Sequence, residues 1–291
     1  MTLLLLLACA ADPKEGPAAD PGDDTAAPEE EDTAPPAPEA PTYSGGVCPT
    51  LVEGTNEGFM SGGEARTFEL RLPANPEGAP VVFGWHWLGG NARQAIRYLE
   101  LESLVEEQGA IVIAPDSCCS DYEWEFISQP EGNVDLALFD DALACLADQF
   151  AVDTRRVYAT GMSAGGLWTS YLTVHRSQNL AATAIFSGGT TGVIAYTAPQ
   201  DDIPVLALWG GPSDTYGPLS FETTTLGMTE DLVADGHFVV ACDHDGGHTI
   251  PADPSSFFLP FFADHEKGQS PEPWAAGLPE GYPSICGIVT P

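Results

Sequence analysis

Short apolar runs alternate along the chain with longer stretches that mix apolar and polar residues. The runs are bounded by turn residues and contain few polar positions, which is typical of strands buried on both faces of a parallel sheet. Residues 65–73 instead alternate apolar and polar positions, as expected of an edge or hairpin strand. We predict the buried strands at residues 79–85, 110–116, 156–161, 181–189, 203–210 and 237–243.

The stretches between these runs are compatible with helices. We predict helices at residues 92–108, 133–150, 164–176 and 221–236. Asn133 is suited to cap the N-terminus of the second of them. The negative charge of Asp135 in its first turn interacts favourably with the positive end of the helix dipole. Because strand and helix alternate through most of the chain, the sequence predicts a mostly parallel, doubly wound α/β sheet with helices on both faces.

The first 46 residues differ in composition from the rest. Residues 1–8 are expected to be a signal peptide, because Leu6-Leu7-Ala8-Cys9 resembles the bacterial lipobox, in which cleavage before the cysteine precedes its lipidation. The apolar run is too short to span a bilayer. Residues 9–46 are rich in Pro, Ala, Asp, Glu and Thr, which predicts a disordered tether, and residues 47–291 form the predicted folded domain.

This organisation predicts a protein outside the cytoplasm. The alternatives are the cell surface, the periplasm and secretion, with membrane contact only through a lipid on Cys9. The formal net charge is −34, and residues 1–46 hold ten acids and one lysine, which leaves −25 on residues 47–291. Nucleic acids and anionic lipid surfaces require clustered Lys or Arg, so the charge argues against both as partners.

The seven cysteines fit an exported protein. If Cys9 carries a lipid, six remain, at positions 48, 118, 119, 145, 242 and 286, which suffices for up to three disulfides. Cys48 and Cys286 flank the folded region and are candidates for a bond that joins its ends. No pair has the C-x-x-C spacing of a zinc site, so we expect no structural metal.

Ser163 is the candidate nucleophile. It lies in the G-x-S-x-G pattern of residues 161–165, a weak signal by itself in a chain with 31 glycines. Its position directly after a predicted strand and directly before a predicted helix matches the strand, sharp turn and helix of a nucleophile elbow. A serine hydroxyl also needs a base and a group that orients the base.

In this type of fold the acid and then the histidine follow the serine in the chain. The loop after residues 203–210 offers Asp214, whereas Asp201 and Asp202 precede that strand at its other end. The loop after the last predicted strand offers His244 and His248. His248 is the better candidate for the base, because it follows two glycines and lies farther from the strand end.

An oxyanion hole needs two backbone donors. One is expected from Ala164, the residue after the nucleophile, and the other from the glycine-containing loop GWHWLGGNA at residues 84–92. Leu88 is the predicted second donor, with Trp87 as its alternative.

Aromatic residues on loops at the expected carboxyl ends of the strands are candidates for substrate binding. The alternative for an individual tryptophan such as Trp168 or Trp209 is a place in the core. The candidates are Trp87, Trp124, Trp209 and Tyr216.

These motifs together resemble a known family. The stretch NVDLALFDDALACLADQFAVDTRRVYATGMSAGG (133–166) resembles the secreted esterases grouped with poly(3-hydroxybutyrate) depolymerases and feruloyl esterases. GWHWLGGNA resembles their His-Gly loop, with Trp87 in place of the usual glycine, and GGHTIP resembles their catalytic-histidine loop. WGGPSD is a looser version of their acid loop. The resemblance covers about residues 60–265.

The resemblance implies an α/β-hydrolase fold and hydrolysis of carboxylic esters without a metal or cofactor. Ser163 would attack the ester, His248 would carry the proton and Asp214 would orient the histidine. The implied substrates are feruloyl, acetyl-xylan or polyhydroxybutyrate esters, which include polymers such as plant polysaccharide esters and polyhydroxyalkanoates. Two alternatives remain: a non-catalytic ligand-binding module on a hydrolase fold, and a peptidase of the same fold. Asp153 and Arg156 are expected to form a structural pair.

Overall fold

The structure, a computed structural model, describes residues 36–291. The predicted signal peptide at residues 1–8, the lipidation at Cys9 and most of the predicted tether lie outside the described residues. Within the described part, no helix combines the length and the apolar character that crossing a membrane would need.

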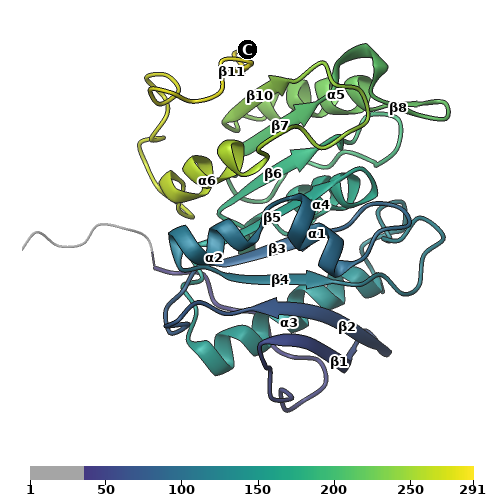
Figure 1. Cartoon of the computed structure of the whole chain (residues 1–291), viewed down its shortest axis with the longest axis vertical. Coiled ribbons are helices and arrows are strands. Elements are labelled where there is room, and N and C mark those ends of the chain that lie inside the picture. Colours follow the sequence, from purple (N-terminus) through teal and green to yellow (C-terminus); the bar gives the residue numbers. More distant parts are fainter. Residues whose placement is uncertain (1–35) are drawn as a thin grey trace, which may run out of the picture. The chain divides into compact units, whose positions relative to one another are not determined.

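A nine-stranded sheet forms the centre of the folded chain (Figure 1). Its strand order is β1-β2-β4-β3-β5-β6-β7-β10-β11, and a separate two-stranded hairpin, β8-β9, follows β7 in the chain. The strands from β4 to β10 in this order run parallel, whereas β1, β2 and β11 join by antiparallel pairing. The strands are β1 (Gly54–Ser61), β2 (Glu64–Arg71), β3 (Val81–Trp85), β4 (Ile111–Pro115), β5 (Val157–Met162), β6 (Ala182–Phe186), β7 (Val205–Trp209), β8 (Thr215–Tyr216), β9 (Leu219–Ser220), β10 (Val239–Asp243) and β11 (Cys286–Ile288).

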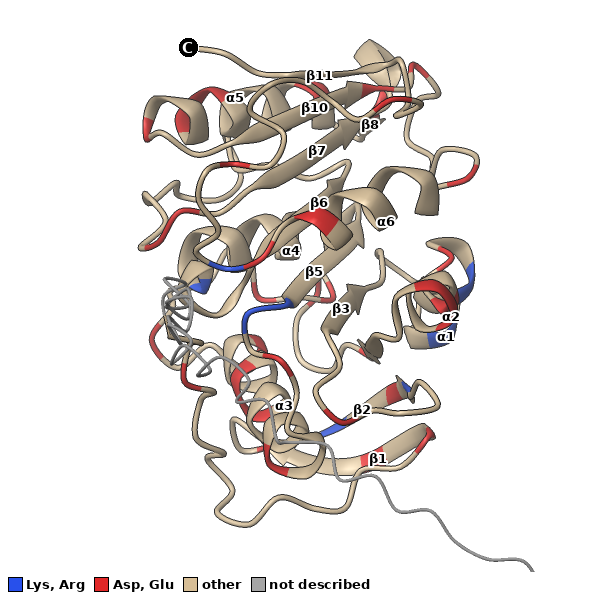
Figure 2. Cartoon of the chain, turned by 90° about the vertical axis from the view of Figure 1, so that its left-hand side faces the viewer, with Lys and Arg blue, Asp and Glu red and all other residues tan. Residues whose placement is uncertain are grey.

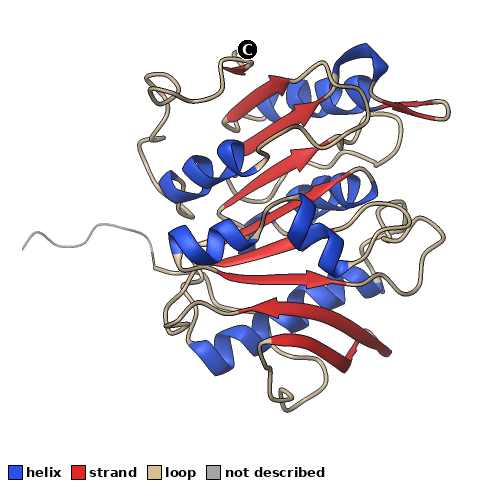
Figure 3. Cartoon of the chain, viewed as in Figure 1, coloured by secondary structure: helices blue, strands red, loops and turns tan. Residues whose placement is uncertain are grey.

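Helices cover both faces of the sheet (Figure 3). One face packs against α1, α2 and α6, and the other packs against α3, α4 and α5. This three-layer arrangement is the predicted doubly wound fold. The helices are α1 (Ala92–Tyr98), α2 (Glu102–Gln108), α3 (Val134–Phe150), α4 (Ala164–His175), α5 (Phe221–Ala234) and α6 (Ser255–Asp264), with short 3₁₀ turns at Ser177–Asn179 and Gly211–Ser213.

The continuous apolar runs are explained by burial on both faces. In β3, Phe83 and Trp85 point into the core beneath α3 and α4, whereas Val82 points into the core beneath α1 and α6. Successive side chains of a strand point to opposite faces, so a strand covered on both sides needs apolar residues at every position. All five residues of β3 are buried.

The predicted strands and most of the predicted helices are confirmed. Asn133 caps α3 by accepting hydrogen bonds from the backbone N–H groups of Asp135 and Leu136, both at 3.0 Å. The predicted helix at 92–108 is instead two helices, α1 and α2. They are separated at Glu100, whose φ of 55° is left-handed and ends a helix.

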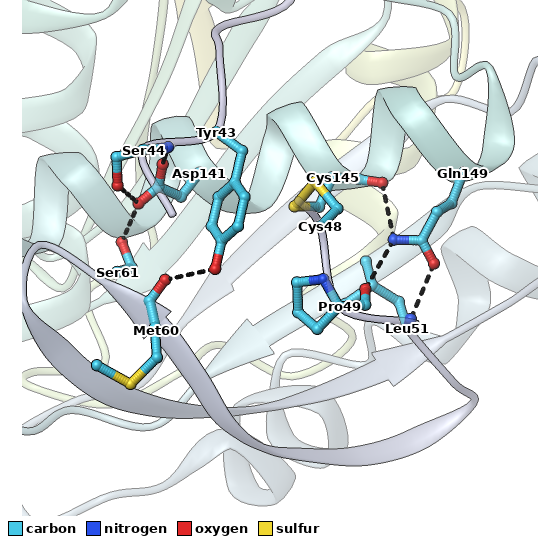
Figure 4. Close-up of a disulfide and its surroundings, with 10 residues drawn as sticks. All are labelled: Tyr43, Ser44, Cys48, Pro49, Leu51, Met60, Ser61, Asp141, Cys145 and Gln149. Atoms are coloured by element: carbon cyan, nitrogen blue, oxygen red, sulfur yellow. Dashed lines mark hydrogen bonds between the residues drawn. A yellow bond between two sulfur atoms is a disulfide. The ribbon is translucent and has the colours of Figure 1, made fainter. Parts of the chain in front are cut away.

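The folded chain begins before residue 47. Tyr43 is buried, and its hydroxyl donates to the carbonyl of Met60 at 2.8 Å (Figure 4). Buried Asp141 of α3 accepts hydrogen bonds from the backbone N–H and the hydroxyl of Ser44, both at 2.7 Å, and from the hydroxyl of Ser61 at 2.6 Å. The predicted end of the tether at residue 46 is therefore too late, because Tyr43 and Ser44 already bind to the sheet and to α3.

The six cysteines outside the signal region form three disulfides. The predicted bond between Cys48 and Cys286 is wrong, because each bonds to a cysteine of the nearest secondary-structure element instead. Cys48 bonds to Cys145 of α3 (Figure 4), and Cys286 of β11 bonds to Cys242 of the neighbouring strand β10. The third bond joins the adjacent residues Cys118 and Cys119.

Acidic residues are spread over most elements of the described chain, and basic residues are few (Figure 2).

Candidate active site

Ser163 occupies a strained turn between β5 and α4. Its φ of 60° and ψ of −118° are unusual for a residue with a side chain, and its backbone N–H donates to the carbonyl of Phe186 at 3.0 Å. Such a conformation costs about 1–3 kcal/mol and persists only where the surroundings enforce it. The turn places the Ser163 hydroxyl at the carboxyl edge of the sheet, as the G-x-S-x-G pattern predicted.

The second glycine of the pattern allows the start of α4 to approach β3. A Cβ atom on Gly165 would lie 2.1 Å from the carbonyl oxygen of Trp85 and 2.7 Å from that of His86. No side chain fits there. The absence of a side chain therefore brings the first N–H groups of α4, including that of Ala164, next to the loop that begins at His86.

The structure brings together the three residues predicted from the sequence. His248 Nε2 lies 2.8 Å from Ser163 Oγ, and His248 Nδ1 lies 2.7 Å from Asp214 Oδ1. The Asp214 side chain is fully buried, and the Ser163 residue is 8% exposed. With Nδ1 protonated toward the carboxylate, Nε2 is free to accept the serine proton.

Ser187 binds the carboxylate oxygen of Asp214 that His248 does not contact, and no sequence motif marks it. Its hydroxyl donates to Asp214 Oδ2 at 2.8 Å, and the backbone N–H of Gly210 donates to the same oxygen at 2.9 Å. Both oxygens of the carboxylate are therefore engaged. The available signal was the position of Ser187 directly after β6, at the same sheet edge as Ser163 and Asp214.

The loops that carry the acid and the histidine touch through their backbones. A Cβ atom on Gly210 would lie 2.0 Å from the carbonyl oxygen of Gly247, and Gly247 N donates to Gly210 O at 2.9 Å. The ring of Phe221, the first residue of α5, stacks on His248 with centroids 4.4 Å apart and an interplanar angle of 11°. These contacts fix the orientation of the imidazole.

The peptide between Trp87 and Leu88 is held by its carbonyl group. The carbonyl oxygen of Trp87 accepts from Gly90 N at 2.8 Å and lies 2.9 Å from His86 Nδ1. Because this peptide bond is trans, the N–H of Leu88 points to the opposite side. The neighbouring N–H of Gly89 donates to Glu123 Oε1 at 2.7 Å. The N–H of Leu88, the predicted donor, is therefore directed away from Gly90 and His86.

His86 is a neutral histidine with a defined tautomer. Its Nε2 accepts from the backbone N–H of Ser117 at 3.1 Å, and its Nδ1 faces a carbonyl oxygen, so Nδ1 carries the proton. Burial lowers the pKa of His86, although the Trp87 carbonyl and the nearby carboxylate of Glu123 act in the opposite direction. The ring thus joins the loop after β3 to the loop after β4.

Glu123 is ionised beside the same loop. Burial raises the pKa of its carboxyl group, but hydrogen bonds from Ser117 and from Gly89 outweigh this effect, so the net shift is downward. Glu123 was not singled out in the sequence, because a glutamate in a loop of an acidic chain carries no distinguishing pattern.

Two cavities meet at Ser163. The larger one has a volume of about 710 Å³ and is lined in part by Trp87, Glu123 and His248. The second has a volume of about 480 Å³ and is lined in part by Phe126 and Leu167. Ser163, Leu88 and Tyr216 line both cavities.

Two of the four aromatic residues predicted to bind substrate lie at these cavities. Trp87 lines the larger cavity, and Tyr216, which is 58% exposed, lines both. The assignments of Trp124 and Trp209 are wrong, since both side chains are buried and neither lines a cavity at Ser163. Trp124 packs edge-to-face on Trp85, and its indole N–H donates to the carbonyl of His86 at 2.9 Å, so it supports the loop from behind.

The remaining polar candidates lie outside the contacts between Ser163, His248 and Asp214. Arg156 Nε lies 2.7 Å from Asp153 Oδ2, as the predicted pair requires. His244 forms a local contact with Gly246 N at 3.2 Å. Among residues 36–291, no group of three or more His, Cys, Asp or Glu side chains is arranged to hold a metal ion.

Solved structures share this architecture. A crystal structure of native sOPH matches with a TM-score of 0.68 and 20% sequence identity, over 84% of this chain and 96% of the other. The chain has the α/β-hydrolase fold. A ferulic acid esterase structure matches more distantly, with a TM-score of 0.57 and 15% identity, over 72% of this chain and 96% of the other.

Sequence comparisons find similarity to esterases. Feruloyl esterase D of Neurospora crassa is 28% identical over 51% of this chain and 54% of its own. Feruloyl esterase C of Emericella nidulans is 26% identical over 69% of this chain and 80% of its own. The model of the prolyl oligopeptidase family matches residues 98–210. For several of the curated relatives the chain spans only about half of their length. Together these matches show that the chain is similar to esterases and has their α/β-hydrolase fold.

Proposed function

We propose that the protein is a serine hydrolase of carboxylic esters, with Ser163 as the nucleophile. The observation that carries the proposal is the continuous chain of contacts from Ser163 Oγ through His248 to the buried carboxylate of Asp214, at 2.8 Å and 2.7 Å. The esterase relatives support the same reaction class.

Acylation begins when Ser163 Oγ attacks the ester carbonyl carbon. The serine proton passes to His248 Nε2, and Asp214 stabilises the imidazolium that forms. The oxygen–carbon bond to the alcohol then breaks, and His248 returns the proton to the leaving alcohol. The product of this half-reaction is an acyl group esterified to Ser163.

Deacylation repeats these steps with water. His248 takes a proton from a water molecule as the water oxygen attacks the acyl carbon, and then returns a proton to Ser163 Oγ. The carboxylic acid leaves and the serine is regenerated.

The N–H groups of Ala164 and Leu88 are the proposed oxyanion donors in both steps. The Ala164 N–H lies in the first turn of α4, whose N–H groups have no partners within the helix. The Leu88 N–H points away from the carbonyl that His86 and Gly90 hold. Preorganised donors of this kind stabilise the negative charge that develops on the carbonyl oxygen.

The proposed substrates are feruloyl or acetyl-xylan esters, or polyhydroxybutyrate. Relatives named as feruloyl and acetylxylan esterases support the first two; polyhydroxybutyrate rests on the motif resemblance.

Location outside the cytoplasm belongs to the proposal and is supported by three disulfides, which persist in oxidising compartments. A lipid anchor at Cys9 rests on the sequence motif, and a lack of labelled palmitate in the full chain expressed in a bacterium would contradict it.

A peptidase is the second candidate, because the matching family model is that of the prolyl oligopeptidases. The same serine and histidine chemistry would cleave an amide. A non-catalytic binding module is less favoured, since the three side chains remain in hydrogen-bonding contact.

A panel of substrates tests the proposal. The full chain is assayed on p-nitrophenyl acetate, methyl ferulate, acetylated xylan, hydroxybutyrate oligomers and a prolyl p-nitroanilide. We expect ester turnover that Ser163→Ala lowers by about 10⁴-fold or more, while Ser256→Ala on α6, which lines neither cavity, leaves it unchanged. Amide turnover alone would favour the peptidase, and no turnover of any substrate by the folded protein would favour the binding module.

A further inference from the structure

The two cavities at Ser163 differ in chemistry. The lining of the 480 Å³ cavity carries no formally charged side chain. The 710 Å³ cavity contains the ionised Glu123 and the imidazole of His248. The lining of the smaller cavity includes Phe126, Ile127, Ala164, Leu167 and Val193.

The position of His248 determines which cavity binds the alcohol group of an ester and which binds the acyl group. The imidazole must return its proton to the oxygen of the leaving alcohol, so that oxygen has to lie near Nε2. His248 and the following Thr249 and Ile250 line the larger cavity. The alcohol therefore extends into the larger cavity.

The acyl chain has to leave the reacting carbon in another direction. Ala164, which supplies one proposed oxyanion donor, lines the smaller cavity but not the larger one. Leu167 lies one helical turn farther along α4 and continues that wall. We propose that the 480 Å³ cavity is the acyl site and that it accepts a bulky, uncharged, apolar acyl group in preference to acetyl. This assignment rests on the proposed esterase function.

The part of the lining formed by Phe126 and Ile127 is preorganised. Phe126 and Ile127 follow Glu125, whose backbone N–H donates to Asp135 Oδ2 at 2.9 Å and whose carbonyl accepts from Asn133 Nδ2 at 2.9 Å. Two residues at the start of α3 thus fix the segment from both sides. Because this apolar wall is already ordered, less of the free energy of binding is spent on ordering it when a ligand binds.

The size and charge of the cavity define the acyl group. Binding cavities for small molecules usually measure about 300–1,000 Å³, so 480 Å³ is far more than a single methyl group would fill. Without a cation in the lining, a carboxylate on the acyl chain would lose its hydration without compensation. A phenyl-bearing acyl chain satisfies both conditions, because the lining is apolar and partly aromatic.

Val193→Trp tests the assignment by filling the acyl site. Val193 is half-buried on a loop, packs against the edge of the core and lines this cavity only, so a larger side chain there narrows the cavity. Val47→Trp is the matched control, because Val47 is 89% exposed and lines neither cavity. The full-length variants are assayed on methyl acetate, methyl 3-phenylpropanoate and 2-phenylethyl acetate.

We expect the full-length wild type to favour methyl 3-phenylpropanoate over methyl acetate by about tenfold or more in kcat/KM, which corresponds to about 1.4 kcal/mol of apolar binding. Val193→Trp should lower this ratio to near one, and Val47→Trp should not change it. An unchanged ratio in Val193→Trp would overturn the assignment. So would a selective loss of 2-phenylethyl acetate turnover, which would mean that the two cavities take the opposite halves of the ester.

A binding measurement separates this inference from the esterase proposal. Ser163→Ala is titrated calorimetrically with methyl 3-phenylpropanoate, with and without Val193→Trp. At least tenfold weaker binding in the double variant supports the acyl site even if the wild type turns over no ester. Equal binding in both proteins overturns the acyl site even if the wild type is an active esterase.

Discussion

The hydroxyl of Ser187 donates a hydrogen bond to Asp214 Oδ2 at 2.8 Å, on the side of the carboxylate opposite His248. Ser187 follows β6 and is fully enclosed, with 1% of its surface exposed. A buried carboxylate needs partners for both oxygens, because burial without hydrogen bonds disfavours its charged form. Ser187 is therefore a positioning residue for the acid.

Ser187→Ala should lower kcat without preventing folding. Loss of one hydrogen bond to a charged group is worth about 1.5 kcal/mol, or about tenfold in rate. KM should change little, because Ser187 lines neither cavity at Ser163. A kcat equal to that of the wild type, or a change in KM alone, would show that Ser187 does not act through Asp214.

Leu88→Pro should affect kcat more than KM. Proline removes the N–H proposed to stabilise the oxyanion, and loss of one such donor lowers kcat by about 10²–10³-fold. Leu88→Ala keeps the N–H and is the matched control, with a loss of tenfold or less. Circular dichroism and thermal unfolding check that both variants fold. Equal kcat in the two variants would exclude the Leu88 N–H as a donor.

His86 should make stability depend on pH. Because burial lowers its pKa in the folded state, the unfolded chain takes up a proton below about pH 6.5 that the folded chain does not. The contribution of His86 to the unfolding free energy is therefore complete above pH 6.5 and decreases as the pH falls. Urea unfolding of the wild type at pH 7.5 and 5.5 measures the loss.

His86→Gln is the comparison for that measurement. Glutamine does not titrate, so the variant should lose less stability than the wild type between pH 7.5 and 5.5. At pH 7.5 it should be about 1–3 kcal/mol less stable, since buried hydrogen bonds to Ser117 N and Trp87 O are disturbed. Equal losses in the two proteins would show that His86 takes up a proton between pH 7.5 and 5.5 in the folded state as it does in the unfolded chain.

The disulfide between Cys48 and Cys145 should contribute to the unfolding free energy but not to ester turnover. It links residues 97 positions apart and fastens the start of the folded chain to α3. Replacing both cysteines by alanine should cost about 2–5 kcal/mol of unfolding free energy. Ester turnover at 20 °C should remain, because neither cysteine lines a cavity at Ser163. A loss of turnover in the folded variant would contradict this separation.

Local patterns were sufficient to predict β2 and the parallel strands of the sheet, but not β1 and β11, and to predict that Ser163, Asp214 and His248 meet at one edge. Buried parallel strands are apolar at nearly every position, and Ser163, Asp214 and His248 each follow such a strand at its carboxyl end. The chain order of these loops therefore predicted which residues meet. Ser187 follows the same rule, but a serine in a loop has no distinguishing neighbour in the sequence.

Other features depend on contacts that local patterns do not encode. Trp124 and Trp209 were placed at the site because their segments end at the correct edge, yet their side chains turn into the core, where apolar burial is more favourable. The disulfide partners of Cys48 and Cys286 depend on which elements are neighbours in space. The break at Glu100 between α1 and α2 has no glycine or proline to mark it.

Covalent trapping of the nucleophile tests the central claim most directly. The full-length protein is treated with an ethyl p-nitrophenyl phosphonate, and intact mass followed by peptide mapping locates the adduct. We expect one adduct, on the peptide that contains Ser163, absent in Ser163→Ala and formed much more slowly in His248→Ala. No adduct on the folded wild type, or an adduct on another residue, would contradict the assignment of Ser163 as the nucleophile.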